Sequence, residues 1–225
     1  MIHESYYWRN ELIHISEKIN KKIKVQKSWS DSKFAKFEKN IMFGFYIIRK
    51  LMEANKLTNK IGSTKFNLKV YENSGRKVTL MNNHRFDENY ELEKSKVAKR
   101  DLKFLINQFV HSYVFVPVIS IVDEKVLKSM ENENLTEDEI AEIYEDSEKE
   151  LTGIFVNTDA NKNDFLFEID INSIIEIFKK VGECNVTRVE MKFNPKKGDY
   201  DTIQFDGENE ISEETKAMID KLEKE

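Results

Sequence analysis

The chain has 225 residues, of which 40% are hydrophobic and 34% are charged, and its formal net charge is −5. This length and hydrophobic content favour one domain with a sizeable core, and the scarcity of Pro and Gly excludes collagen-like or long low-complexity chains. The single cysteine, Cys184, excludes an internal disulfide and any multi-cysteine metal site, which is typical of a reducing compartment.

No secretory leader is recognisable at the N-terminus, and the longest apolar run, Tyr113 to Val122, is about half the length of a membrane-spanning helix. We therefore expect a cytoplasmic protein that has no membrane segment. Lys outnumbers Arg by 30 to 6, a bias that indicates an AT-rich genome, bacterial or viral. Because lysine is the default polar residue in such a proteome, its abundance alone is weak evidence for function.

Charge is divided unevenly along the chain. Residues 1–130 hold 25 bases and 14 acids, a net of +11, whereas residues 131–150 hold 10 acids and one lysine, a net of −9. The basic half predicts salt-dependent binding of phosphates, and its low Arg content argues against base-specific readout. The candidate nucleic-acid-binding residues gather at one end of a predicted helical hairpin, near Trp29: Lys18, Lys21, Lys22, Lys24, Lys27, Lys33, Lys36 and Lys39. A solvated lysine face is the alternative interpretation.

Hydrophobic periodicity predicts an antiparallel helical hairpin within residues 1–60. Its first helix runs from about Ser5 to Gln26, and its second carries an apolar stripe from Phe34 to Met52. Residues 61–130 and 151–206 are predicted to form a sheet with helices. In the first of these segments we expect a β-hairpin of "KFNLKVY" and "RKVTLM", a helix over Val97 to Ser112, and a strand "VFVPVISIV" in which Pro117 indicates an edge or a bulge.

The C-terminal half predicts two further hairpins and a helix. The strands "GIFVN" and "FLFEI" pair, the helix "SIIEIFKKVG" has a capping box of Ser173 and Glu176 and stops at Gly182, and "VTRVEMKF" pairs with "YDTIQF". Residues 131–150 are expected to be a mobile acidic insertion around a short helix capped at Thr136 and Glu139, and residues 207–225 a C-terminal helix. The sum is a single α+β domain whose sheet is mostly antiparallel.

The first predicted helix carries "RNELIH", in which Arg9 and Asn10 precede His14. This resembles the R-x4-6-H signature of HEPN-domain ribonucleases. The resemblance implies metal-independent RNA cleavage at a homodimer interface, with imidazole transferring a proton and guanidinium stabilising the phosphorane. HEPN domains are all-helical and carry the motif on a later helix, so one exposed turn of an amphipathic helix is the alternative interpretation.

A second polar group, composed of His84, Asp87, Arg100, Asn107 and His111, could do acid–base work if the loop after the predicted hairpin approached the following helix. The alternative interpretation is that Asn107 and His111 hydrogen-bond to the backbone where this helix turns into the next strand. The chain also resembles uncharacterised bacterial cytosolic proteins in three stretches of sequence: "RNEL" near the N-terminus, "FYIIRKL" in the second predicted helix, and "NQFVHSYVF", which contains Asn107 and His111. That resemblance implies no particular function.

No cofactor or structural metal is expected. The segment "DANKNDFLFEID" places Asp159, Asn161 and Asn163 at calcium-loop spacing, but Asp164 occupies the position of the required Gly and Asp170 that of the bidentate Glu. Phosphate-loop, zinc and hydrolase motifs are absent. The leading hypothesis is a non-enzymatic protein that binds nucleic acid or a partner protein, and the ribonuclease is its alternative.

Overall fold

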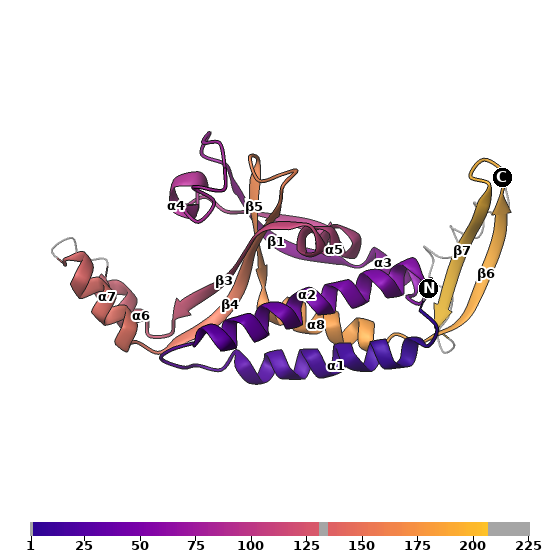
Figure 1. Ribbon diagram of the computed structural model, residues 1–225, viewed down its shortest axis with the longest axis horizontal. Coiled ribbons are helices and arrows are strands. Elements are labelled where there is room, and N and C mark those ends of the chain that lie inside the picture. The colour runs from indigo at the N-terminus through magenta and orange to yellow at the C-terminus, as the bar shows by residue number, and fades with distance from the viewer. Residues whose placement is uncertain (1, 131–134, 207–225) are drawn as a thin grey trace.

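A computed structural model describes residues 2–130 and 135–206 (Figure 1). The chain opens with two long helices, α1 (Ser5–Lys22) and α2 (Asp31–Glu53), which pack side by side as the predicted hairpin. The first helix ends before Gln26 because the backbone of Gln26 pairs with that of Lys149 in an isolated β-bridge. The other described helices are α3 (Asn59–Ser63), α4 (Phe86–Asn89), α5 (Leu102–Val110), α6 (Glu124–Met130), α7 (Glu137–Asp146) and α8 (Ile171–Glu183).

A five-stranded sheet forms the centre of the molecule, in the order β2-β1-β5-β4-β3, and every neighbouring pair is antiparallel. Its strands are β1 (Lys65–Glu72), β2 (Lys96–Asp101), β3 (Ser112–Ile121), β4 (Lys149–Thr158) and β5 (Phe165–Asp170). A separate hairpin of β6 (Val186–Asn194) and β7 (Asp199–Asp206) projects from one end (Figure 1). The predicted α+β class with an antiparallel sheet is confirmed.

Four helices, α1, α2, α5 and α8, lie on one side of this sheet (Figure 1). Helices α5 and α8 contact β4, while α2 contacts α5 and α8, and α1 contacts α8. Three phenylalanines pack together where α2, α5 and α8 meet. The Phe45 ring stacks on the Phe109 ring, with 3.9 Å between their centroids, and makes an edge-to-face contact with the Phe178 ring, with 5.2 Å between centroids. All three side chains are fully buried, so this junction joins α2, α5 and α8 in one apolar core.

Two predicted elements between residues 73 and 112 are wrong. The stretch "RKVTLM" is not a strand, because β1 pairs with β2 on one side and with β5 on the other; residues 73–95 instead cross the second face of the sheet. The helix predicted from Val97 begins only at Leu102, since residues 96–101 form β2. The Asp101 side chain then caps α5 by accepting from the Phe104 backbone N–H at 2.8 Å.

The signals predicted for the ends of α8 are also wrong. Its N-cap is Asp170, whose carboxylate accepts from the Ser173 backbone N–H at 2.7 Å, in place of a Ser173–Glu176 box. The helix continues through Gly182 to Glu183. A Cβ at Gly182 would lie 2.7 Å from Cγ1 of Ile13 and 3.0 Å from the Arg9 carbonyl oxygen. This glycine therefore permits the close approach of α1.

Several local predictions are confirmed. Pro117 lies in an edge strand, β3, with irregular register nearby, and β4–β5 and β6–β7 pair as expected. The Thr136–Glu139 capping box starts α7. The predicted insertion extends too far, because Lys149 already begins β4. The predicted C-terminal helix lies outside the described residues, and within them no helix is long and apolar enough to cross a membrane.

The packing of α2 on α8 predicts opposite effects of two glycine substitutions. A Cβ at Gly44 would overlap the buried Phe178 ring, whereas one at Gly62, in α3, meets no atom within 4 Å. Gly44→Ala should lower the free energy of unfolding by about 1–3 kcal/mol through overpacking. Gly62→Ala should raise it by about 0.5–1 kcal/mol through helix propensity. Urea unfolding of both variants tests this, and equal stabilities would contradict the tight α2–α8 contact.

Candidate functional site

A lysine-rich pocket lies where α1 ends and α2 begins. Its cavity of about 240 Å³ has an apolar part that includes Ile23, Trp29 and Phe37. The Trp29 ring lies 5.4 Å from the Phe34 ring, and its Nε1 is buried without a hydrogen-bond partner. We call this site the lysine pocket, and its lining residues are Lys21, Lys22, Ile23, Lys24, Val25, Gln26, Trp29, Lys33 and Phe37.

Positive charges crowd one another around this pocket. Partial burial lowers the pKa of Lys22, and the nearby ammonium groups of Lys36 and Lys18 lower that pKa further. Two of the predicted lysines have acidic partners, Lys18 with Glu11 at 3.6 Å and Lys27 with Asp146 at 3.5 Å. Such exposed pairs are worth about 0–1 kcal/mol, so they screen the cluster only weakly.

Four of the eight predicted lysines line the pocket, and the other four lie outside its lining. Lys21, Lys22, Lys24 and Lys33 line the pocket, and Lys33 also donates to Oε1 of Gln26 at 3.0 Å. Lys18 of α1 and Lys36 of α2 lie near enough to Lys22 to lower its pKa further, after the effect of burial. Lys27 is directed to Asp146, and Lys39 lies exposed further along α2, outside the pocket lining.

The residues of the motif "RNELIH" do not share one site: Arg9 packs against the end of α8, whereas His14 is exposed to solvent. The Arg9 guanidinium donates to the Cys184 carbonyl oxygen at 2.5 Å, at the negative C-terminal end of α8, and the Nε of Arg9 is buried without a partner. Asn10 is half-buried and His14 is exposed. Arg9 therefore contributes to the packing of α1 on α8, while His14 is directed to solvent.

The second polar group is dispersed. Arg100 lies 5.4 Å from the Phe104 ring, and Nε2 of His111 lies 3.3 Å from Nη1 of Arg49. Asn107 is exposed, as are His84 and Asp87 in the segment that crosses the second sheet face. In the part of the chain that the structure describes, no hydrogen bond or ion pair joins any two of the five: His84, Asp87, Arg100, Asn107 and His111.

The calcium-like segment is a hydrogen-bonded turn. Oδ1 of Asn161 accepts from the Thr158 backbone N–H at 2.8 Å, and Oδ1 of Asn163 accepts from that of Val78 at 2.9 Å. Asp159 pairs with Lys162. These oxygens thus hold the turn and the crossing segment together, and the described residues contain no group of three or more His, Cys, Asp or Glu side chains suited to a metal ion.

A charged cluster that the sequence did not reveal lies on the second face of the sheet, where a buried carboxylate meets an exposed lysine. The Glu168 side chain, only 10% exposed, accepts from Lys69 Nζ at 2.9 Å and from the Tyr71 hydroxyl. Burial, followed by this contact with Glu168, raises the pKa of Tyr71 well above its usual value, so the phenol remains a donor. Beside the cluster, a Cβ at Gly153 would lie 2.9 Å from the Ile169 carbonyl oxygen, so this glycine permits the close approach of β4 and β5.

This cluster borders an open cleft of about 720 Å³ that spans the sheet from β2 to β3. The lining mixes charged, hydroxyl and apolar side chains: Asn67, Leu68, Lys69, Tyr71, Val97, Val118, Ser120, Thr152, Phe155, Glu168, Asp170 and Ser173. Strand alternation places Glu168 on the face opposite Phe167 and Ile169. The β1–β5 register that brings Glu168 to Lys69 cannot be deduced from the separate strands.

The buried phenols predict an alkaline loss of stability. A group whose pKa is raised on folding stabilises the native state below its unfolded pKa, about 10 for tyrosine, and this stability is lost as pH rises toward the folded pKa. Burial raises the pKa of Tyr90 to about 12 and that of Tyr71 further. Tyr71→Phe should therefore flatten the fall in unfolding free energy above about pH 10. Tyr200→Phe, at an exposed site, should not, and equal slopes would contradict the assignment.

Comparison of the chain with protein-family models, with curated proteins and with solved structures gives no match. The function has to be inferred from the surfaces of this chain itself. The lysine pocket combines a cavity with a concentration of like charge, whereas the cleft beside Glu168 has a lining of mixed charge and polarity.

Proposed function

We propose that the protein binds a polyanion, nucleic acid in particular, through the lysine pocket and the lysines beside it. The observation that carries this proposal is the gathering of four lysines, Lys21, Lys22, Lys24 and Lys33, in the lining of one pocket. Partial burial lowers the pKa of Lys22, and the nearby ammonium groups of Lys36 and Lys18 lower it further. Like charges at such spacing repel one another. A phosphate backbone laid across them would relieve that repulsion and release its own condensed counterions.

The pocket also contains an aromatic ring on which a base of single-stranded nucleic acid could stack. The Trp29 indole forms part of the lining beside Lys21 and Lys33, and a base stacked on such a ring contributes about 1–3 kcal/mol. Lysine ammonium groups act as point charges and not as bidentate forks. We therefore expect binding that depends strongly on salt and weakly on base sequence.

The same proposal places the protein in the cytoplasm of a bacterium with an AT-rich genome. Its support is the lysine bias of the sequence and the buried free thiol of Cys184, the one cysteine of the chain. The ribonuclease alternative receives no added support from the described residues, because Arg9 is engaged by the end of α8.

Charge reversal in the pocket tests the proposal. The double variant Lys22→Glu/Lys36→Glu should weaken binding of a fluorescein-labelled single-stranded RNA by about tenfold or more at low salt, because phosphate contacts are lost. The matched control is Lys179→Glu/Lys196→Glu, an equal charge change at exposed residues of α8 and of the β6–β7 turn. Fluorescence anisotropy measures both, and equal losses would mean that net charge, not the pocket, determines affinity.

Trp29 provides an independent readout. In the Trp8→Phe variant, Trp29 is the one remaining tryptophan. Its emission should be quenched as RNA is added and should recover in high salt, since screening weakens phosphate contacts. RNA kept in EDTA with the protein should stay intact. Binding without a change in Trp29 emission would place the nucleic acid elsewhere, and cleavage that disappears in His14→Ala would favour the ribonuclease.

A further inference from the structure

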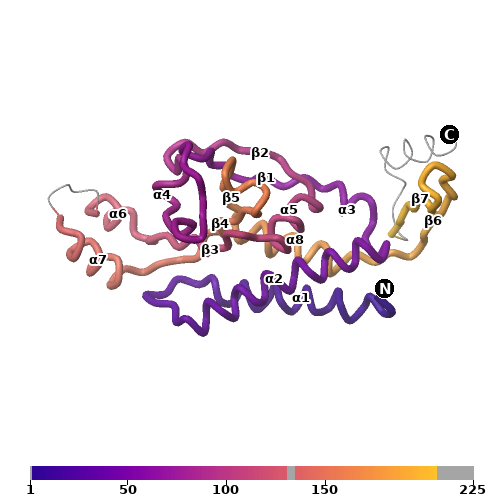
Figure 2. Tube along the Cα trace, turned by 45° about the horizontal axis from the view of Figure 1, so that its top comes forward, coloured from indigo at the N-terminus to yellow at the C-terminus, as the bar shows by residue number. Residues whose placement is uncertain are grey.

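Helices α6 and α7 form an arm that projects from the tip of the β3–β4 pair, at the end of the molecule opposite the β6–β7 hairpin (Figures 1 and 2). Neither helix contains a buried residue. Their described contacts are mainly with each other and, for α6, with β3. We call residues 123–148 the arm, of which 131–134 lie outside the described residues.

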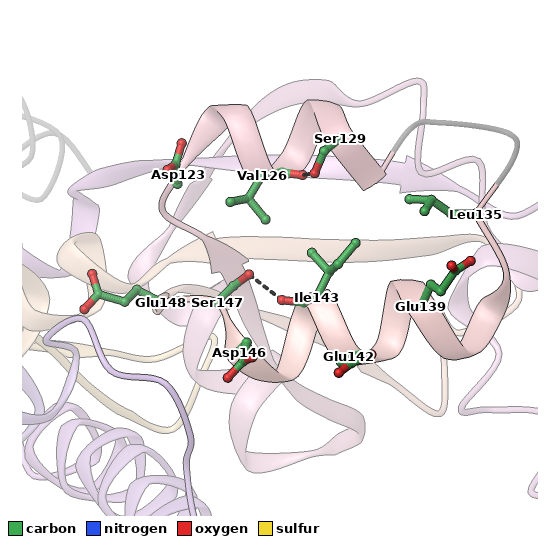
Figure 3. Close-up of a pocket in the computed structure, with 10 residues that line it drawn as sticks. All are labelled: Asp123, Val126, Ser129, Leu135, Glu139, Glu142, Ile143, Asp146, Ser147 and Glu148. Carbon is green, nitrogen blue, oxygen red and sulfur yellow. Dashed lines mark hydrogen bonds between the residues drawn. The ribbon is translucent and has the colours of Figure 1, made fainter.

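The two helices enclose a groove of about 660 Å³ (Figure 3). Val126 from α6 and Ile143 from α7 point toward each other across it, and Leu135 approaches from the segment before α7. We call these three apolar residues the floor of the groove. Acidic side chains surround the floor: Asp123, Glu139, Glu142, Asp146 and Glu148. Additional apolar surface is exposed nearby at Leu127 and Tyr144.

The charge of the arm is largely uncompensated by the rest of the protein. Its described residues hold nine carboxylates and two lysines, a net of −7. Among them, Asp146 is the one carboxylate in an ion pair, with the exposed Lys27. Lys149 does not neutralise the arm carboxylates directly, because its Nζ donates to the backbone carbonyls of Tyr144, Glu145 and Ser147. Lys149 therefore caps α7 and leaves the rim acidic.

We propose that this groove docks a basic amphipathic helix of a partner protein. Apolar side chains of such a helix would enter between Val126 and Ile143, while its lysines and arginines meet the acidic rim. Amphipathic helices bind grooves of this kind by burying one apolar face. The C-terminal segment of this chain is a poor occupant, because residues 207–225 hold seven acids and three lysines. This proposal does not depend on the lysine pocket.

A synthetic helix tests it on the full-length protein. The probe is a fluorescein-labelled amphipathic peptide of Leu and Lys, about 18 residues or roughly five helical turns long, and a Leu/Glu peptide with the same apolar stripe is its counterpart. The Leu/Lys peptide should bind and should weaken by about tenfold when screening is raised to molar salt. The Leu/Glu peptide should not bind. Equal binding of both peptides would overturn the proposal.

Two arm variants and one control locate the contact. Ile143→Ser removes part of the groove floor, and Glu142→Lys reverses a charge on its rim; each should weaken peptide binding by about fivefold or more. The control Glu145→Lys makes the same charge change on α7 outside the groove lining and should change affinity less than twofold. Circular dichroism should show all three folded, since none of these positions is buried.

Three results would overturn docking of a partner helix in the groove. Equal weakening by Glu142→Lys and Glu145→Lys would mean that the peptide is held by diffuse charge attraction. Unchanged binding in Ile143→Ser would mean that the apolar floor is not used. Self-association of the protein in sedimentation, lost in Ile143→Ser, would assign the groove to a second copy of the chain. RNA binding at the lysine pocket is measured separately, so either proposal can fail alone.

Discussion

The fold depends on the close packing of α8 against α1 and α2. This helix lies against β4 and β5 and also contacts α1 and α2, so it joins the sheet to the helical hairpin. Two glycines make that possible: Gly44 of α2 accommodates the Phe178 ring, and Gly182 of α8 accommodates Ile13 of α1. The lysine pocket is held in place by that junction, because the two helices that form the pocket are positioned by it.

Charged side chains of this protein have two different roles. Arg9 and Lys149 are inward-directed cations that satisfy backbone carbonyls at the C-terminal ends of α8 and α7. The lysines near Trp29, which are exposed except for the half-buried Lys22, and the exposed carboxylates of the arm mostly have no partner of opposite charge among the described residues. The first kind contributes to stability, and the second kind is suited to recognition of other molecules.

Sequence periodicity was sufficient for elements whose burial is one-sided. The two long helices, the β4–β5 and β6–β7 hairpins and the capped helix α7 were all predicted, because their apolar spacing and caps are local signals. The region from residue 73 to residue 101 was not, since the partners of β1 are remote strands and the crossing segment has little regular structure. The cluster around Glu168 was missed for the same reason: its three members come from two strands almost 100 residues apart.

The register of β3 with β4 has a consequence for how this protein could have been assembled. Ile121 pairs directly with Lys149, so the arm occupies the place of a hairpin turn, and the two strands on either side would still meet if a two-residue turn replaced it. Because the entropy of closing a loop grows only slowly with its length, an insertion at such a point costs the core little. An acidic recognition module at this position could be gained, exchanged or lost in a lineage without rebuilding the sheet and helices beneath it.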